Sequence, residues 1–215
     1  KNNIFSVSYR KSEAINYISM TPHPGSPLKG KNSHDDFDPF NDRLSRDIRN
    51  ALSKAFVDSL AEMAPSGYQT VIEKWLAGRP AAGYIKYIRD RLYRYDRVLA
   101  QTKAIRLIDA LLQSLVIWNN GLFFEFHDHL ERIWQKTDGD EHQALKGLIK
   151  AAGVYIHMEH NHQQAVDSLS TKSFNLMRRY AHCLTFITNL DVLLLSIKNL
   201  NPVSPKLENP ALGIT

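Results

Sequence analysis

Residues 121–134 read GLFFEFHDHLERIW, and this stretch decides the fold because its apolar side chains recur at helical spacing. When each residue advances by about 100° around a helix axis, five apolar residues fall within one arc. An arc of this kind must face a core, so the stretch predicts an amphipathic helix packed against other helices. The members of the arc are Phe123, Phe126, Leu130, Ile133 and Trp134.

Helical spacing continues over most of the chain outside this stretch. No proline occurs between Ala81 and Asn201, and proline breaks helix interiors, so this span predicts an unbroken series of helices. Turn residues separate them at 65–67, 119–121 and 137–140. We find no pattern typical of a strand. The predicted fold is all-α, a compact multi-helix bundle with extended N- and C-terminal arms.

Proline and glycine placement divides the chain into four predicted segments. The two ends are rich in proline, which excludes regular helix there. The segments are an extended or flexible N-terminal arm (1–37), N-terminal helices packed on the bundle (38–100), the helical bundle domain (101–200) and a C-terminal tail (201–215).

Two local predictions concern the ends of helices. Gly78 follows the segment TVIEKWLA and is predicted to close that helix as a C-terminal glycine cap. Apolar residues from Ile105 through Ile108 to Trp118 keep one face, so we expect a single helix over 105–118.

Composition narrows the class of protein. The formal charge is +5 and there is one cysteine, Cys183, which excludes an intramolecular disulfide and favours a buried, inert thiol in a reducing compartment. No apolar run is long enough to cross a bilayer, and the amino end lacks a signal-peptide pattern. We therefore expect a soluble cytoplasmic protein.

A candidate polar pair lies on the flank of the helix in residues 121–134. His127 and Glu131 stand four residues apart and are neighbours on a helix surface. The carboxylate is expected to raise the pKa of His127 and to orient its ring, which serves proton transfer or support of a metal. The structural alternative is that two half-buried polar groups satisfy each other.

Three further residues complete a candidate polar cluster. Glu125 and Asp128 lie further round the helix from the apolar arc. Antiparallel packing across the turn at 137–140 brings the following helix back, so that His157 approaches them. The predicted cluster is Glu125, His127, Asp128, Glu131 and His157.

Such carboxylates and imidazoles are ligands for zinc, iron or manganese. The spacing, however, matches neither a His-Glu-x-x-His motif nor a pair of Glu-x-x-His motifs. We predict no metal ligands and no cofactor, and keep a divalent metal at the cluster as an alternative. His157, His160 and His162 form a second histidine group, which favours a solvated turn over an ion site.

A basic face is predicted within residues 79–106, where eight Lys or Arg stand against two Asp. A stripe of cations is suited to contacts with the phosphates of a nucleic acid. Tyr84 and Tyr95, however, fall on the opposite face of the helix, where they cannot stack on its bases. A charged face turned to solvent is the favoured interpretation. The candidate basic face is Lys86, Arg89, Arg94 and Arg97.

The segments NNGLFFEFHDHLERIW, GLIKAAGVYIH and QQAVDSL together resemble the helical domain of unknown function family 309, over about residues 105–180. Asp128 stands where that family has glutamate, and Asn161-His162 replaces its Gly-Asn turn. The resemblance implies a compact helical bundle and implies no reaction. The positions that match the family pattern are Gly121, Glu125, His127, Leu130, Glu131, Trp134, Gly147 and His157.

Three functions remain open from the sequence. An interaction or structural module, acting as a homo-oligomer or with a protein partner, is favoured because helical hairpins present grooves to partner segments. An enzyme or metal-assisted hydrolase using the acidic and histidine cluster is the alternative. Nucleic-acid binding through the basic face is disfavoured, and we expect no membrane association.

Overall fold

The computed structural model describes residues 37–213, and helices joined by short connections make up most of this part. The predicted N-terminal arm lies outside the described residues, except for Phe37. No strand occurs within residues 37–213, and the all-α prediction is confirmed. The α-helices of this part are α1 (Arg43–Ala61), α2 (Ser66–Ala77), α3 (Ala82–Ala104), α4 (Ala110–Asn119), α5 (Phe123–Trp134), α6 (Gly139–Glu159), α7 (Gln163–Arg179) and α8 (Leu190–Lys198). None of them is both long and apolar enough to serve as a membrane span.

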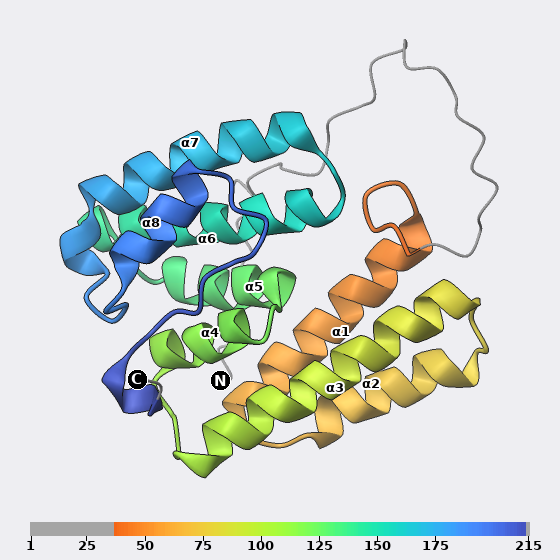
Figure 1. The fold of residues 1–215 in the computed structure, drawn as a ribbon. Helices are drawn as coiled ribbons and strands as arrows, with labels where there is room; N and C mark the ends of the chain where they lie inside the picture. The colour runs from red at the N-terminus through yellow and green to blue at the C-terminus, as the bar shows by residue number, and fades with distance from the viewer. Residues whose placement is uncertain (1–36, 214–215) are drawn as a thin grey trace, which may run out of the picture. The chain divides into compact units, whose positions relative to one another are not determined.

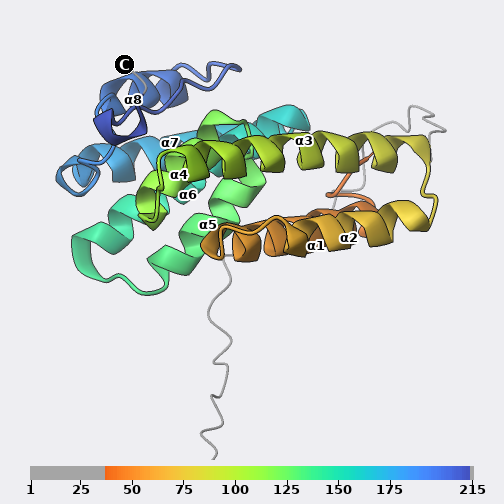
Figure 2. The same ribbon diagram turned by 90° about the horizontal axis from the view of Figure 1, so that it is seen from below.

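The first three helices pack on one another, with α3 lying over α1 and α2 and running in nearly the same direction as they do (Figures 1 and 2). α1 begins where the side chain of Asp42 accepts hydrogen bonds from two backbone amides of its first turn. Phe56 of α1 stacks on Tyr95 of α3 with ring centroids 4.1 Å apart. The hydroxyl of Tyr68 in α2 donates to Asp96 at 2.7 Å. Aromatic packing and a polar link therefore fix α3 above the other two helices.

The remaining helices surround the tryptophan of α4. Trp118 is 1% exposed, and its ring meets the edges of Phe123, Phe126 and Tyr155 at 5.0–5.4 Å. α6 and α7 run side by side (Figure 1). They approach closely at Gly147, where an added methyl group would lie 3.0 Å from the backbone nitrogen of Met177. α5 packs between α1 and α6 and so joins the two groups of helices.

Both predicted helix ends need correction. Gly78 does end α2, but its φ is −69°, and Arg79 is the residue in the left-handed region, with φ 48°. The predicted helix over 105–118 is too long, because α4 begins only at Ala110, where the side chain of Asp109 accepts from Leu112 N at 3.0 Å. Ile108 lies in the connection and is 87% exposed.

The C-terminal tail is tied to the bundle and contains one turn of 3-10 helix. It runs from α8 back to the C-terminal end of α4, where Trp118 Nε1 donates to Pro205 O at 2.9 Å (Figure 1). The 3-10 turn Pro210–Leu212 contradicts the expectation that proline excludes helix there, because proline in a first turn forfeits no backbone hydrogen bond. Cys183, expected to be buried, is half-buried in a 3-10 turn after α7.

Candidate functional site

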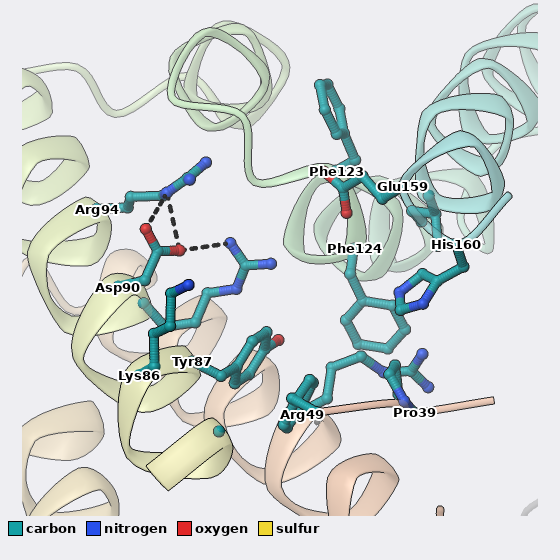
Figure 3. Close-up of a pocket in the computed structure, with 14 residues that line it drawn as sticks. Pro39, Arg49, Lys86, Tyr87, Asp90, Arg94, Phe123, Phe124, Glu159 and His160 are labelled. Carbon is teal, nitrogen blue, oxygen red and sulfur yellow. Dashed lines mark hydrogen bonds and ion pairs between the residues drawn. The ribbon is translucent and has the colours of Figure 1, made fainter. Parts of the chain in front are cut away.

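A pocket of about 480 Å³ opens between α1, α3, α5 and α6 (Figure 3). Its volume is within the range of pockets that bind small molecules. α3 supplies one side with charged residues, and Phe123, Phe124, Glu159 and His160 lie on the opposite side (Figure 3). The lining residues used below are Phe37, Arg49, Lys86, Tyr87, Asp90, Arg91, Arg94, Phe123, Phe124, Glu159 and His160.

Two arginines on the α3 side are held by acids. Arg94 Nε lies 3.0 Å from Asp90, one helical turn earlier, and Arg94 Nη1 donates to the carbonyls of Asn120 and Gly121 at 3.2 Å. Arg91 Nη1 reaches the same aspartate at 3.3 Å. Arg94 therefore braces the turn between α4 and α5, and its charge is balanced locally.

Glu125 lies at the base of this region, 0% exposed. One carboxylate oxygen accepts from the Tyr95 hydroxyl at 2.6 Å and lies 3.3 Å from Arg91 Nε. Burial lowers the pKa of Arg91, but Glu125 and two tyrosines raise it by a larger amount. The pKa is therefore well above its ordinary value, and the guanidinium stays charged. Burial also raises the pKa of Tyr95 well above its ordinary value, which keeps its proton available to Glu125.

Arg49 of α1 differs from these arginines because it pairs with no acid. Its side chain is buried, with the residue 4% exposed, and within the described part of the chain it donates hydrogen bonds to the amide oxygen of Asn50 at 3.1 and 3.2 Å. Its guanidinium carbon sits 3.8 Å from the centre of the Phe124 ring. Within residues 37–213, no ion pair joins Arg49 to a carboxylate. Burial lowers its pKa.

The Tyr87 hydroxyl is an unsatisfied polar group at the pocket. It is buried and has no hydrogen-bond partner within the described residues. Its ring stacks on Phe37 with centroids 3.6 Å apart, and the guanidinium carbon of Arg91 lies 4.7 Å from the ring centre. Burial raises the pKa of Tyr87 to about 12, so the hydroxyl is protonated at neutral pH and can donate.

The predicted polar cluster divides in the structure. His127 Nε2 lies 4.0 Å from Glu131 Oε1, with the side chains 24% and 29% exposed. Asp128 accepts from Ser53 Oγ of α1 at 2.9 Å. The expected direction of the His127 pKa is wrong, because burial lowers that pKa to about 4 and outweighs the opposing charge of Asp128. Glu125 does not lie away from the core as the helical projection indicated, since α3 covers it.

His157 is placed in a separate group. Its Nδ1 lies 3.2 Å from Nδ1 of His162, and Phe40 packs against the rings of His157, His160 and His162 at 4.5–5.0 Å. Burial, and then the neighbouring histidines, lower the pKa of His157 to about 4. His157 is 9% exposed, so the turn is less solvated than expected. Among the described residues, no group of three His, Cys, Asp or Glu side chains is arranged to hold a metal ion.

The predicted basic face also divides. Lys86 and Arg94 line the pocket, whereas Arg89 and Arg97 are exposed and outside its lining.

Sequence reasoning missed Arg49, Tyr87 and Arg91. Arg49 carries a usable signal, because it falls on the apolar stripe of α1 between the faces of Ile48 and Phe56, where an arginine is out of place. Tyr87 and Arg91 gave no such signal, since charged and aromatic residues alternate throughout α3.

Comparison with known proteins adds one finding. Residues 111–169 match the model of a family described as Domain of unknown function (DUF309). The match extends from α4 into α7 and confirms the resemblance, over a narrower range than expected. No curated protein and no solved structure matches the chain. Glu125 and Phe124 fall inside the matched range, whereas Arg49, Tyr87 and Arg91 fall outside it, so the pocket is built from both parts.

Proposed function

We propose that this protein is an interaction module that recognises an anionic group of its partner in the pocket between α1, α3, α5 and α6. The observation that carries the proposal is Arg49, a buried guanidinium at the pocket without a carboxylate partner among the described residues. We continue to predict that the protein is located in the cytoplasm and that it functions without a cofactor.

Physical chemistry makes such an arginine costly unless something binds it. A charge removed from water destabilises a fold by several kcal/mol unless it is paired and hydrogen-bonded. The ring of Phe124 offsets part of this cost through a cation–π contact. A bound anion would supply the rest, because hydrogen bonds between charged groups are about twice as strong as neutral ones.

Other charges at the pocket act in the same direction. The lining contains four cations (Arg49, Lys86, Arg91 and Arg94) and two carboxylates (Asp90 and Glu159), and the pairing of Arg91 with Glu125 reduces the excess to one positive charge. A cleft lined by an excess of one sign attracts ligands of the other sign.

Catalysis is supported less well by the geometry. The enzyme hypothesis uses His127 and Glu131, which are absent from the residues that line the pocket. His127 also has a pKa of about 4, so it is uncharged at neutral pH and has weak basicity. The residues that line the pocket can bind a ligand, so the geometry favours ligand recognition over catalysis.

The test compares Arg49→Met with Arg43→Met, a matched control on the same helix whose side chain is 91% exposed. Sulfate and phosphate are titrated at constant ionic strength, and binding is followed by amide chemical shifts of the full chain. We expect saturable binding in the natural protein and in Arg43→Met, and at least tenfold weaker binding in Arg49→Met.

Chemical denaturation accompanies the titration. Methionine fills a similar volume and keeps a contact with Phe124, so we expect Arg49→Met to unfold no more easily than the natural protein. Equal anion binding by both variants would contradict the proposed function.

A further inference from the structure

We infer that residues 37–41, a strap that runs just ahead of α1, close one end of the pocket at neutral pH and are released when the histidines around Phe40 take up protons. The release of the strap does not depend on the proposed function. Its consequence for an anionic ligand rests on that function, because the strap borders the same pocket.

One end of the strap is fixed to α3. Phe37 stacks on Tyr87 with ring centroids 3.6 Å apart and meets the edge of Tyr84 at 6.1 Å. Phe37 and Pro39 both line the pocket, and Pro39 lies on the side of the pocket that carries His160 (Figure 3). Departure of Phe37 would therefore uncover the Tyr87 ring on the α3 side.

The other end of the strap is fixed by Phe40 to the end of α6 and the turn before α7. The Phe40 ring packs against three imidazole rings, with centroids 4.5–5.0 Å away. The strap thus joins α3 to α6 across one end of the pocket. The three rings are those of the second histidine group, His157, His160 and His162.

The histidine group holds together only while its rings are largely neutral. Nδ1 of His157 lies 3.2 Å from Nδ1 of His162. A hydrogen bond between two imidazole nitrogens needs one donor and one acceptor, and a charged imidazole carries a proton on both nitrogens. When both rings are charged, two N–H groups face each other and the contact becomes repulsive.

The other charged groups around the histidines come from the strap and from α1. Asp38 attracts a charged His160, whereas Arg49 repels it, and burial lowers the pKa of His160 by more than Asp38 raises it. Glu159 is next to His160 in the chain but interacts with Arg91 and other charges near α3. The carboxylate of Asp38 therefore opposes the release without preventing it.

Protonation favours the released state, because the rings regain water when Phe40 leaves. Burial, and then the neighbouring histidines, lower the pKa of His157 from 6.5 to about 4 in the closed structure. Between pH 6.5 and pH 4 the released state therefore binds more protons, and the closed state is lost as the pH falls. A ring that regains its ordinary pKa makes release about tenfold more favourable at pH 5.5 than at pH 7.5.

A backbone amide reports the release directly. Asp38 N donates to Ser45 Oγ of α1 at 3.0 Å, and this bond is broken when the strap leaves. Amide exchange of the full chain is measured by NMR at pH 7.5 and 5.5 and corrected for the intrinsic exchange rate at each pH. We expect the protection of Asp38 to be about tenfold lower at pH 5.5. The Tyr68 amide, which donates to Ser59 Oγ at 3.1 Å, is the matched control and should change less than about twofold.

Two variants identify the groups that carry the response. Phe40→Ala removes the ring that the histidines hold, so Asp38 should already be weakly protected at pH 7.5. His157→Gln keeps a polar side chain that does not titrate, so the difference between the two pH values should fall to about twofold. His182→Gln is the control for His157→Gln, because that side chain is 64% exposed, and it should keep the full response. Thermal unfolding curves at pH 7.5 show that each variant is folded.

Three outcomes would overturn the inference. Unchanged protection of Asp38 in Phe40→Ala would show that the ring does not hold the strap, and a full pH response in His157→Gln would show that this imidazole is not the trigger. Higher protection at pH 5.5 would show that a charged imidazole binds the Phe40 ring more tightly through a cation–π contact. Each measurement is made without an added anion, so the strap can fail while the dependence of anion binding on Arg49 holds, and the reverse.

Discussion

Glu125 shows at the residue scale what a helical projection cannot predict. The projection of α5 has one apolar arc and leaves Glu125 outside it, because it assumes a single packing face. In the structure α3 covers a second face and encloses Glu125 with Tyr95 and Arg91. The residue was identified as a candidate from the sequence, but its partners lie 30 and 34 positions away in the chain and follow no local pattern.

Replacing Glu125 by Gln should destabilise the protein by about 3 kcal/mol, because Arg91 then loses its buried counter-charge. The free energy of unfolding in urea measures this loss. Glu131→Gln is the matched control on the same helix, where burial raises the pKa of the carboxyl group and thereby disfavours its charge. That control should change stability by less than about 0.5 kcal/mol. Similar losses in both variants would contradict the assigned ion pair.

Acid should unfold the protein through its buried histidines. The pKa of His127 and that of His157 are lowered from 6.5 to about 4 in the folded chain. Between pH 4 and pH 6.5 these histidines bind more protons in the unfolded chain than in the folded chain. Their contribution to the free energy of unfolding, present above pH 6.5, is therefore lost as the pH falls toward 4. Each histidine contributes about 3 kcal/mol to this loss.

Replacing His157 by Leu should remove its share of the pH dependence, which urea unfolding at pH 7, 5.5 and 4.5 measures. His182→Gln serves as the control, because that side chain is 64% exposed. An unchanged slope in His157→Leu would show that this imidazole does not titrate as described.

At the element scale, the helix boundaries were predictable where a run of apolar residues at helical spacing was followed directly by residues that favour turns. Asn120-Gly121 and Asn161-His162 ended helices as expected, since Gly121 and Asn161 take positive φ angles of 68° and 56°. The segment 105–109 was mispredicted because Ile105 and Ile108 keep helical spacing although neither packs inside. Spacing alone does not show that Asp109 begins a new helix by capping it.

Gly147 and Gly153 of α6 should respond in opposite directions to alanine. A methyl group at Gly147 would lie 2.8 Å from Met177 Cγ and 3.0 Å from its backbone nitrogen, so Gly147→Ala should cost about 1–2 kcal/mol despite better helix propensity. At Gly153 the nearest atom is the flexible tip of Leu169 at 3.2 Å, so Gly153→Ala should be neutral or add up to about 1 kcal/mol. Thermal and urea unfolding test both signs, and a stabilised Gly147→Ala would contradict the close approach of α6 and α7.

At the scale of the whole molecule, the tail depends on contacts between distant parts of the chain. Asn119 donates to the carbonyl of Leu207 at 2.8 Å and accepts from its amide at 2.7 Å. Proline content predicted correctly that residues 201–213 contain no α-helix, but it did not predict the 3-10 turn Pro210–Leu212. It did not predict the attachment, because a side-chain amide that pairs with a backbone peptide leaves no periodic signal.

Asn119→Ala should release the tail. Two hydrogen bonds of about 1 kcal/mol each are lost, and we expect faster proteolytic cleavage and amide exchange over residues 201–209. Val203→Ser is the control, since Val203 is 74% exposed and its replacement leaves the attachment intact. Equal cleavage of the two variants would show that Asn119 does not hold the tail.

The division of the pocket between matched and unmatched parts of the chain has an evolutionary consequence. Glu125 lies in the portion that matches the family model, while the arginine that neutralises it belongs to α3. A protein that carries the matched helices among different neighbours must supply another counter-charge for an acid at this position or lose the acid. The matched helices alone would then give the scaffold without the pocket, which also needs α1 and α3.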